Sequence, residues 1–185
     1  MNFIVLDTET TNGFDDSLCY DIGYAIVNAE TFEVLETRSF VVADIFLDKT
    51  LMADAFFSDK IPQYWKEIKK GTRELKTFYN IVRQFRQDYK FYNCVATCCH
   101  NARFDHNACQ TSQRFITKSK HRYFFPYGNE MWCSLKMARQ TFAKDETYKN
   151  FCKENGFTLA NGSPRLTAEI LYRFISKDLS FEFRI

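Results

Sequence analysis

The first hundred residues show strand-like hydrophobic patterns before they show a helical one. Residues 3–6 form a continuous apolar run, as in a buried central strand, and residues 20–27 and 34–42 are rich in aromatic and β-branched side chains. These segments predict a three-stranded β-meander. Apolar residues then recur at helical spacings of three and four, before residues 91–98 return to strand character, which predicts a βαβ arrangement. The members of that stripe are Leu75, Phe78, Val82, Phe85 and Tyr89.

The rest of the chain is predicted to be mainly helical. Residues 104–115 have helical character, and residues 136–142 and 145–155 are further candidates, the last of them stopped by Gly156. A final helix is introduced by Ser163-Pro164, and its shared face consists of Leu166, Ile170 and Phe174. A meander, a βαβ unit and trailing helices together predict an α/β domain.

Composition narrows the class of protein. The 185 residues fit one domain, and 45% hydrophobic with 26% charged residues excludes disordered, collagenous and coiled-coil proteins. A net charge of +2 indicates that any polyanion is bound locally. The chain has neither a signal-peptide pattern nor an apolar run that could span a membrane, so we expect a cytoplasmic protein without a membrane partner.

The cysteines lack the spacing of a disulfide framework. Their number is odd, which suits reduced thiols in a reducing compartment. They are Cys19, Cys94, Cys98, Cys99, Cys109, Cys133 and Cys152.

Two carboxylates end the first predicted strand. In an extended segment residues two apart face the same side, so Asp7 and Glu9 are expected to project together. Their mutual repulsion would be relieved by a divalent cation, and hard oxygen ligands suit Mg²⁺ or Mn²⁺. An acidic-x-acidic triplet also arises by chance in most chains of this size. Its position directly after a hydrophobic central strand favours the metal-binding interpretation.

A second group of candidate residues runs from His100 to Asp105, after a predicted strand and at the start of a helix. Asp105 falls in the first helical turn, where the helix dipole favours a carboxylate. If the two strands are neighbours, Asp105 would face Asp7 and Glu9. The alternative is an ordinary helix start capped by Asn101.

Together the two groups resemble the DEDD, or DnaQ-like, family of 3'-5' exonucleases. Asp7 and Glu9 match that family's DxE motif at the end of the first strand, and Asn101, Phe104 and Asp105 match its N-x-x-F-D motif at the start of a helix. The resemblance is greatest to phage-encoded members and runs across nearly the whole chain. The further stretches that carry it are 51–53, 60–64, 123–128 and 168–174.

The resemblance implies an RNase H-like fold, with a mixed central sheet flanked by helices. It implies two-metal catalysis with Mg²⁺ or Mn²⁺ at the 3' ends of single-stranded DNA or RNA, releasing nucleoside 5'-monophosphates. Asp7 would bridge both ions, and Glu9 and Asp105 would complete the ligands available here.

The same resemblance implies roles in nucleotide binding. Thr10 and Thr11 would hold the terminal nucleotide, and Asn101 and Phe104 would shape its pocket. A basic loop offers phosphate contacts, although a solvated loop is the more common interpretation of such a cluster. Its residues are Lys118, Lys120, His121 and Arg122.

The third family motif has no counterpart in these residues. In the family a Phe-Glu step, matched by Phe181-Glu182, leads to a general-base His and, five residues on, to the fourth metal-binding Asp. The last histidine here is His121, and the sequence reaches Ile185 without this pair. We therefore expect a single exonuclease-like domain over 1–185, truncated before that motif and with doubtful activity. The alternative is a non-catalytic remnant that binds nucleic acid or a partner.

Truncation also predicts how the end of the chain packs. The tail over 181–185 alternates apolar residues, so it is expected to cover the gap or to enter a second copy of the chain. A homodimer, or a replication or repair protein, is the expected partner.

Two other interpretations of the sequence are less favourable than the carboxylate site. A zinc site is disfavoured because paired C-x-x-C elements are missing and a strand would point Cys98 and Cys99 to opposite faces. The residues of that rival cluster are Cys98, Cys99, His100, His106 and Cys109. Residues 7–11 also faintly resemble the D-x-D-x-T motif of haloacid-dehalogenase phosphatases, in which the Asn101–Asp105 block has no role.

Overall fold

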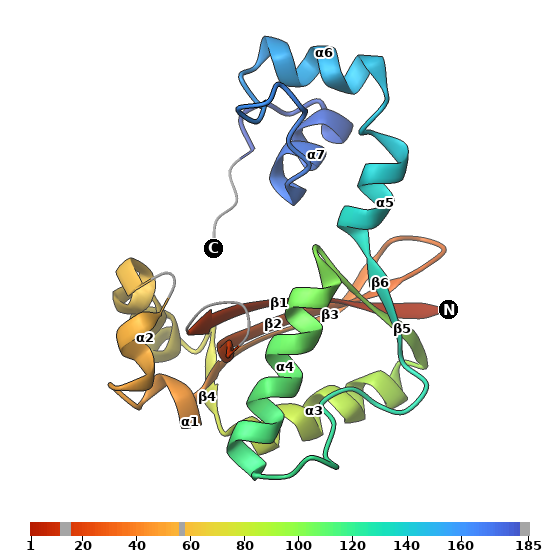
Figure 1. Cartoon of the computed structure of the whole chain (residues 1–185). Coiled ribbons are helices and arrows are strands. Elements are labelled where there is room, and N and C mark those ends of the chain that lie inside the picture. Colours follow the sequence, from red (N-terminus) through yellow and green to blue (C-terminus); the bar gives the residue numbers. More distant parts are fainter. Residues whose placement is uncertain (12–15, 56–57, 182–185) are drawn as a thin grey trace. The chain divides into compact units, whose positions relative to one another are not determined.

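The computed structural model describes residues 1–11, 16–55 and 58–181, which form two compact units (Figure 1). Unit 1 comprises Met1–Cys99 and Arg103–Trp132, and unit 2 comprises His100–Ala102 and Cys133–Ile185. The expectation of a single domain over 1–185 stays a prediction.

The sheet is mixed and has six strands in the order β4-β3-β2-β1-β5-β6. Strands β1 to β3 form the antiparallel meander, while β5 pairs parallel with β1 and β4 pairs parallel with β3. The predicted meander and mixed sheet are thus confirmed. The strands are β1 Asn2–Thr11, β2 Leu18–Asn28, β3 Val34–Val42, β4 Glu74–Lys76, β5 Cys94–Cys99 and β6 Glu130–Cys133.

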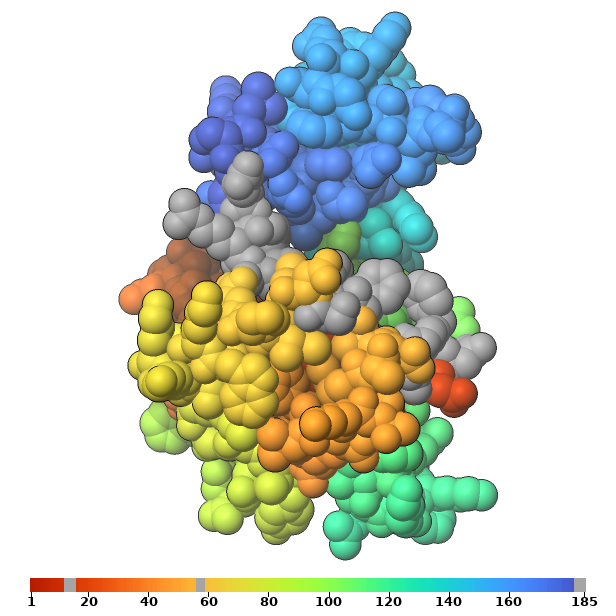
Figure 2. Space-filling view, turned by 90° about the vertical axis from the view of Figure 1, so that its left-hand side faces the viewer, coloured from red at the N-terminus to blue at the C-terminus, as the bar shows by residue number. Residues whose placement is uncertain are grey.

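The helices of unit 1 divide into two groups. Figure 1 shows the long helices α3 and α4 against one face of the sheet, where the Phe85 ring of α3 meets Tyr24 of β2 edge to face at 5.3 Å. The segment from α1 to β4 covers another side of unit 1, orange and yellow in Figure 2. The helices are α1 Ala43–Phe46, α2 Ile61–Lys70, α3 Phe78–Phe91 and α4 Ala102–Thr117, with 3₁₀ turns at Leu51–Asp54 and Ser58–Lys60.

One detail of the predicted pattern is wrong in unit 1. Leu75 lies in β4, and helix α3 begins only at Phe78, where the Thr77 side chain accepts a hydrogen bond from the Asn80 amide. Pairing of β4 with β3 overrides the helical spacing of Leu75. The basic run over 66–73 includes the end of helix α2 at Gly71, and its last residue, Arg73, is mostly buried.

Unit 2 packs helices around aromatic rings. Tyr148 of α6 is fully buried, and its ring meets Phe174 of α7 edge to face at 4.9 Å. Leu166 was predicted to lie on the last helix, but that helix begins at Ala168 because the Thr167 side chain caps it. The helices are α5 Ser134–Thr141, α6 Glu146–Glu154 and α7 Ala168–Ser176.

The predicted tail is described only at its first residue. The Phe181 ring lies 4.2 Å from the Tyr172 ring between centroids, and the Phe181 carbonyl accepts a hydrogen bond from Arg173 at 2.7 Å. Residues 182–185, on which the rest of that prediction falls, lie outside the described residues.

Candidate active site

Strand β1 presents alternate residues to two environments. Leu6 and Thr8 are buried on one face, whereas Asp7 is exposed and Glu9 is half-buried on the other. Across the antiparallel ladder Asp7 is opposite Gly23, which has no side chain, and Glu9 is opposite Asp21. The pleat of a single strand therefore places both predicted carboxylates on the same face, as the sequence predicted.

Strand β5 brings the third carboxylate to the same edge of the sheet. Its parallel pairing with β1 puts the carboxyl ends of the two strands at one edge, and helix α4 follows directly. Asp105, in the first turn of α4, is 2% exposed, and its Oδ1 accepts a hydrogen bond from the Thr8 hydroxyl at 3.0 Å. Residues 97 positions apart in the chain are thereby joined.

The three carboxylates share an electrostatic environment. Burial, followed by the charge of Asp7, raises the pKa of Asp105 to about 7. The same two causes, in the same order, raise the pKa of Glu9 to about 7. Burial of the carboxyl group also raises the pKa of Asp7, although the residue as a whole is exposed to solvent. Strongly raised carboxyl pKa values from burial and like charge are typical of functional sites.

The structure places an ion pair beside these carboxylates that the sequence did not predict. Arg73 forms a salt bridge with the buried Asp21, and its Nε lies 2.9 Å from Glu67 Oε2. Burial still raises the pKa of Asp21, although Arg73 acts in the opposite direction. Arg73 lies 52 positions from Asp21, so only the pairing of β4 with β3 brings them together. No local sequence signal could have identified this pair.

Carboxylate oxygens suit a hard divalent cation, but the described residues do not form a complete set of metal ligands. The oxygen ligands repel one another, and a cation would relieve the repulsion that raises their pKa values. Within 1–11, 16–55 and 58–181, no group of three or more His, Cys, Asp or Glu side chains is gathered closely enough to hold a metal ion. The binding of a cation by Asp7, Glu9 and Asp105 therefore stays a prediction.

The predicted nucleotide-binding residues fall in different surroundings. Thr10 and Thr11 are buried at the end of β1, and the Thr11 hydroxyl has no hydrogen-bond partner among the described residues. Phe104 is half-buried in unit 1, whereas Asn101 is exposed in unit 2, with a left-handed backbone at φ 75°. Their roles in nucleotide binding stay predictions.

The residues of the rival zinc site are engaged elsewhere. Both ring nitrogens of His100 contact oxygens within unit 2, at 3.0 Å from Ser134 Oγ and 2.8 Å from the Leu166 carbonyl. Cys109 is buried beside Cys19, and the His106 ring stacks on Phe125 at 5.3 Å. None of the seven cysteines, all of which lie in the described segments, forms a disulfide.

Comparison with known proteins identifies the fold. No family model matches the sequence, and no curated protein matches it. The apo structure of Exonuclease I is similar to this chain with a TM-score of 0.59 and 14% identity, over 93% of this chain and 36% of that one. E. coli Exonuclease I in complex with a dT13 oligonucleotide gives a TM-score of 0.58 at 15% identity, over 95% and 36% of the two chains.

A second solved protein is similar over its whole length. The nuclease domain of 3'hExo, described as a DEDDh family member bound to rAMP, gives a TM-score of 0.54 at 10% identity. The match covers 100% of this chain and 96% of that domain, whereas this chain spans only about a third of Exonuclease I. The chain thus has the RNase H-like fold of these exonucleases, as predicted.

Within the described segments, no helix is both long enough and apolar enough to cross a bilayer.

Proposed function

We propose that this chain is a metal-dependent nuclease that removes nucleotides from the 3' end of a single nucleic acid strand. The observation that carries the proposal is the position of Asp7 and Glu9 on one face of β1 and of Asp105 at the same edge of the sheet, where burial and then the charge of Asp7 raise the pKa values of Glu9 and Asp105. The fold shared with Exonuclease I and 3'hExo supports a nuclease, and the oligonucleotide bound to Exonuclease I supports a strand as substrate.

Mg²⁺ or Mn²⁺ would be held by Asp7 together with Glu9 and Asp105. When bound, such an ion polarises a phosphoryl oxygen and lowers the pKa of a coordinated water. Neighbouring residues of the chain orient these carboxylates and modify their charge. The Thr8 hydroxyl orients Asp105, and the positive charge of Lys60 favours the ionised form of Glu9. Arg73 opposes the charge of Asp21, so Asp21 adds less repulsion beside Glu9.

The test is digestion of a 3'-labelled single strand by the whole chain with Mg²⁺, Mn²⁺ or EDTA. We expect release of mononucleotides with either metal and none in EDTA. Asp7→Asn should abolish release, whereas Glu33→Gln, an exposed carboxylate outside the site, should not change it. RNA and DNA strands tested side by side would identify the preferred sugar.

Two results would contradict the proposal. Metal-independent release, or release that survives Asp7→Asn, would remove the carboxylates from the reaction. Binding of strands without any release would instead support the non-catalytic alternative predicted from the sequence.

A further inference from the structure

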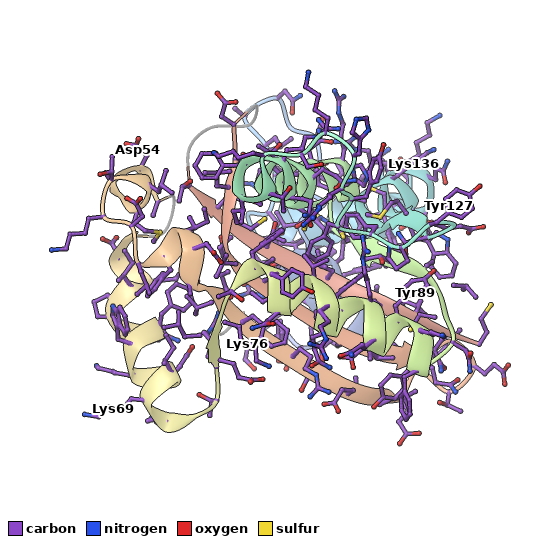
Figure 3. The ribbon with its side chains drawn as sticks, turned by 90° about the horizontal axis from the view of Figure 1, so that it is seen from below. Asp54, Lys69, Lys76, Tyr89, Tyr127 and Lys136 are labelled. Carbon is purple, nitrogen blue, oxygen red and sulfur yellow. The ribbon has the colours of Figure 1, made fainter. Side chains whose placement is uncertain are left out.

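Unit 1 contains a groove that the carboxylate site does not use. It has a volume of about 1550 Å³ and is lined by helix α3, helix α4 and the loop that follows α4. Figure 3 shows Tyr89, on α3, and Tyr127, in that loop, at the same end of unit 1. Asp7, Glu9 and Asp105 are not among the lining residues.

One side of the groove is a basic stripe on α3. Tyr79, Arg83, Arg86 and Lys90 all line the groove and follow spacings of four, three and four, so they lie on one face of the helix. All four side chains are exposed. Arg83 and Lys90 are two helical turns apart, about 11 Å at about 1.5 Å per residue. This length can follow more than one phosphate of a strand.

The opposite side adds cations and open aromatic rings. His121, Arg122, Tyr123 and Tyr127 line the groove from the loop, and Tyr127 is fully exposed. The loop is held to α3 because Arg86 donates hydrogen bonds to the Tyr123 and Phe124 carbonyls. The rings and the cations are therefore presented by a constrained loop.

Among the lining residues that the structure describes, none is acidic. Among the residues that the structure describes, no carboxylate pairs with Arg83, Lys90 or Arg122. Asp88 lies on α3 but is buried on its other side, where it accepts a hydrogen bond from the Tyr24 hydroxyl at 2.8 Å. Glu130, which follows the loop, accepts a hydrogen bond from the Trp132 indole at 3.1 Å. The lining itself is cationic.

We propose that this groove binds a single nucleic acid strand as a second site, separate from the carboxylates. Cations along one wall suit phosphates, and open tyrosine rings suit stacked bases, which is the combination that single-strand binding surfaces use. The amide side chains of Gln87, Gln110 and Asn129 also line the groove and offer hydrogen bonds to bases. The inference rests on the proposed nuclease function only for the choice of a nucleic acid as occupant.

The first test measures binding of fluorescent oligothymidylate to the whole chain in EDTA, by anisotropy at several salt concentrations. The groove variant is Arg83→Gln, Lys90→Gln and Arg122→Gln combined. We expect at least about a tenfold loss of affinity and a salt dependence whose slope falls by about 2, since each lost phosphate contact removes about 0.7 on a single strand. Thermal melting of each variant establishes that it is folded.

The matched control removes three lysines from α2, as Lys66→Gln, Lys69→Gln and Lys70→Gln. These lysines are equally exposed, and Lys69 lies at the opposite end of unit 1 from Tyr89 and Tyr127 in Figure 3. We expect this control to retain affinity. An equal loss in both triple variants would overturn the proposal, because net charge alone would then explain binding.

A second variant tests stacking without changing charge. Tyr127→Ala should lower affinity by about 5- to 150-fold, whereas Tyr127→Phe, which keeps the ring, should not. A competition experiment distinguishes a nucleic acid from an acidic protein segment as the occupant of the groove. If polyglutamate displaces the strand at equal charge concentration, an acidic protein segment is the better partner and the proposal is overturned.

The experiments distinguish a failure of the groove proposal from a failure of the nuclease proposal. Asp7→Asn should bind the strand in EDTA with unchanged affinity while losing cleavage. In the cleaving protein, the groove variant should raise the KM for a long strand more than the KM for a dinucleotide, because only the long strand reaches the groove. A rise of equal size for both substrates would contradict a separate site.

Discussion

The two units differ in what they bury. Every buried polar or charged side chain of the described residues lies in unit 1, including Asp21, Asp88 and Asp105. The core of unit 2 consists of apolar and aromatic residues around Tyr148, whose hydroxyl donates to the Arg165 carbonyl at 2.5 Å. Burying a charge costs free energy unless it is paired, so unit 1 needs partners for its buried acids, as Arg73 provides for Asp21, whereas unit 2 does not.

The contrast extends to the direction of the pKa shifts. In unit 1 burial and like charge raise the pKa values of Glu9 and Asp105 to about 7. In unit 2 burial lowers the pKa of His100 below 6.5. Both shifts favour the neutral form, but they make the two units respond to pH in opposite directions.

The largest expected effect is on catalysis. Asp105→Asn in unit 1 should lower the rate of 3' nucleotide release by at least about 10²-fold, the loss typical of removing one electrostatic group from an active site. The matched variant Glu154→Gln, an exposed carboxylate in unit 2, should leave the rate unchanged. Single-turnover kinetics with Mn²⁺ measures both. Equal rates for Asp105→Asn and the natural chain would remove Asp105 from the site.

The next largest effects are on core packing in each unit. Phe85→Ala in unit 1 and Tyr148→Ala in unit 2 should each lower the free energy of unfolding by about 3–5 kcal/mol, because both remove a fully buried ring. Hydrogen exchange should show the largest loss of protection in the substituted unit. Tyr148→Phe keeps the ring and loses the hydroxyl, which donates to the Arg165 carbonyl and also contacts the Cys152 side chain, so its cost should be about 1 kcal/mol. Uniform loss across both units would show that they unfold as one.

The pH response provides a third comparison. In EDTA the folded state of unit 1 keeps protons on Glu9 and Asp105 between about pH 4 and about pH 7, where the unfolded chain has released them. The stability of unit 1 should therefore fall as pH rises through that range. Both tryptophans, Trp65 and Trp132, lie in unit 1, so urea unfolding followed by tryptophan fluorescence reports on it.

Unit 2 should respond in the opposite sense. As pH falls below about 6.5, the unfolded imidazole of His100 gains its proton before the folded one does, so stability is lost toward acid. Asp105→Asn should reduce the slope in unit 1, and His100→Gln should reduce the slope in unit 2. A pH-independent fluorescence midpoint in EDTA would contradict the carboxylate environment described above.

The smallest expected effect tests how Asp105 is oriented. Thr8→Val keeps the shape of the side chain but removes the hydroxyl that donates to Asp105. We expect a loss of about 1 kcal/mol in stability at neutral pH, and a further rise in the pKa of Asp105, because the hydrogen bond favours its ionised form. Carboxyl chemical shifts followed through a pH titration measure the pKa directly. An unchanged titration would mean that Thr8 does not position this carboxylate.

Local patterns determined much of the fold. The alternation and apolar runs of β1 to β3 come from residues next to one another in the chain, and so does the helical character of 104–115, which lies within α4. The position of Asp7 and Glu9 on one face is also a local property, because residues two apart on a strand share a face. Helix caps were harder to predict from the sequence. Thr77 and Thr167 cap two helices, which therefore begin after Leu75 and Leu166.

Only the tertiary structure decided what surrounds the carboxylates. The parallel pairing of β1 with β5 brings Asp105 to Thr8, and the pairing of β3 with β4 brings Arg73 to Asp21. The desolvation that raises the pKa values of Glu9 and Asp105 likewise depends on neighbours from several elements. Burial and distance are properties of packed segments far apart in the chain, so the sequence alone predicted the candidate carboxylates but not their charge state or their partners.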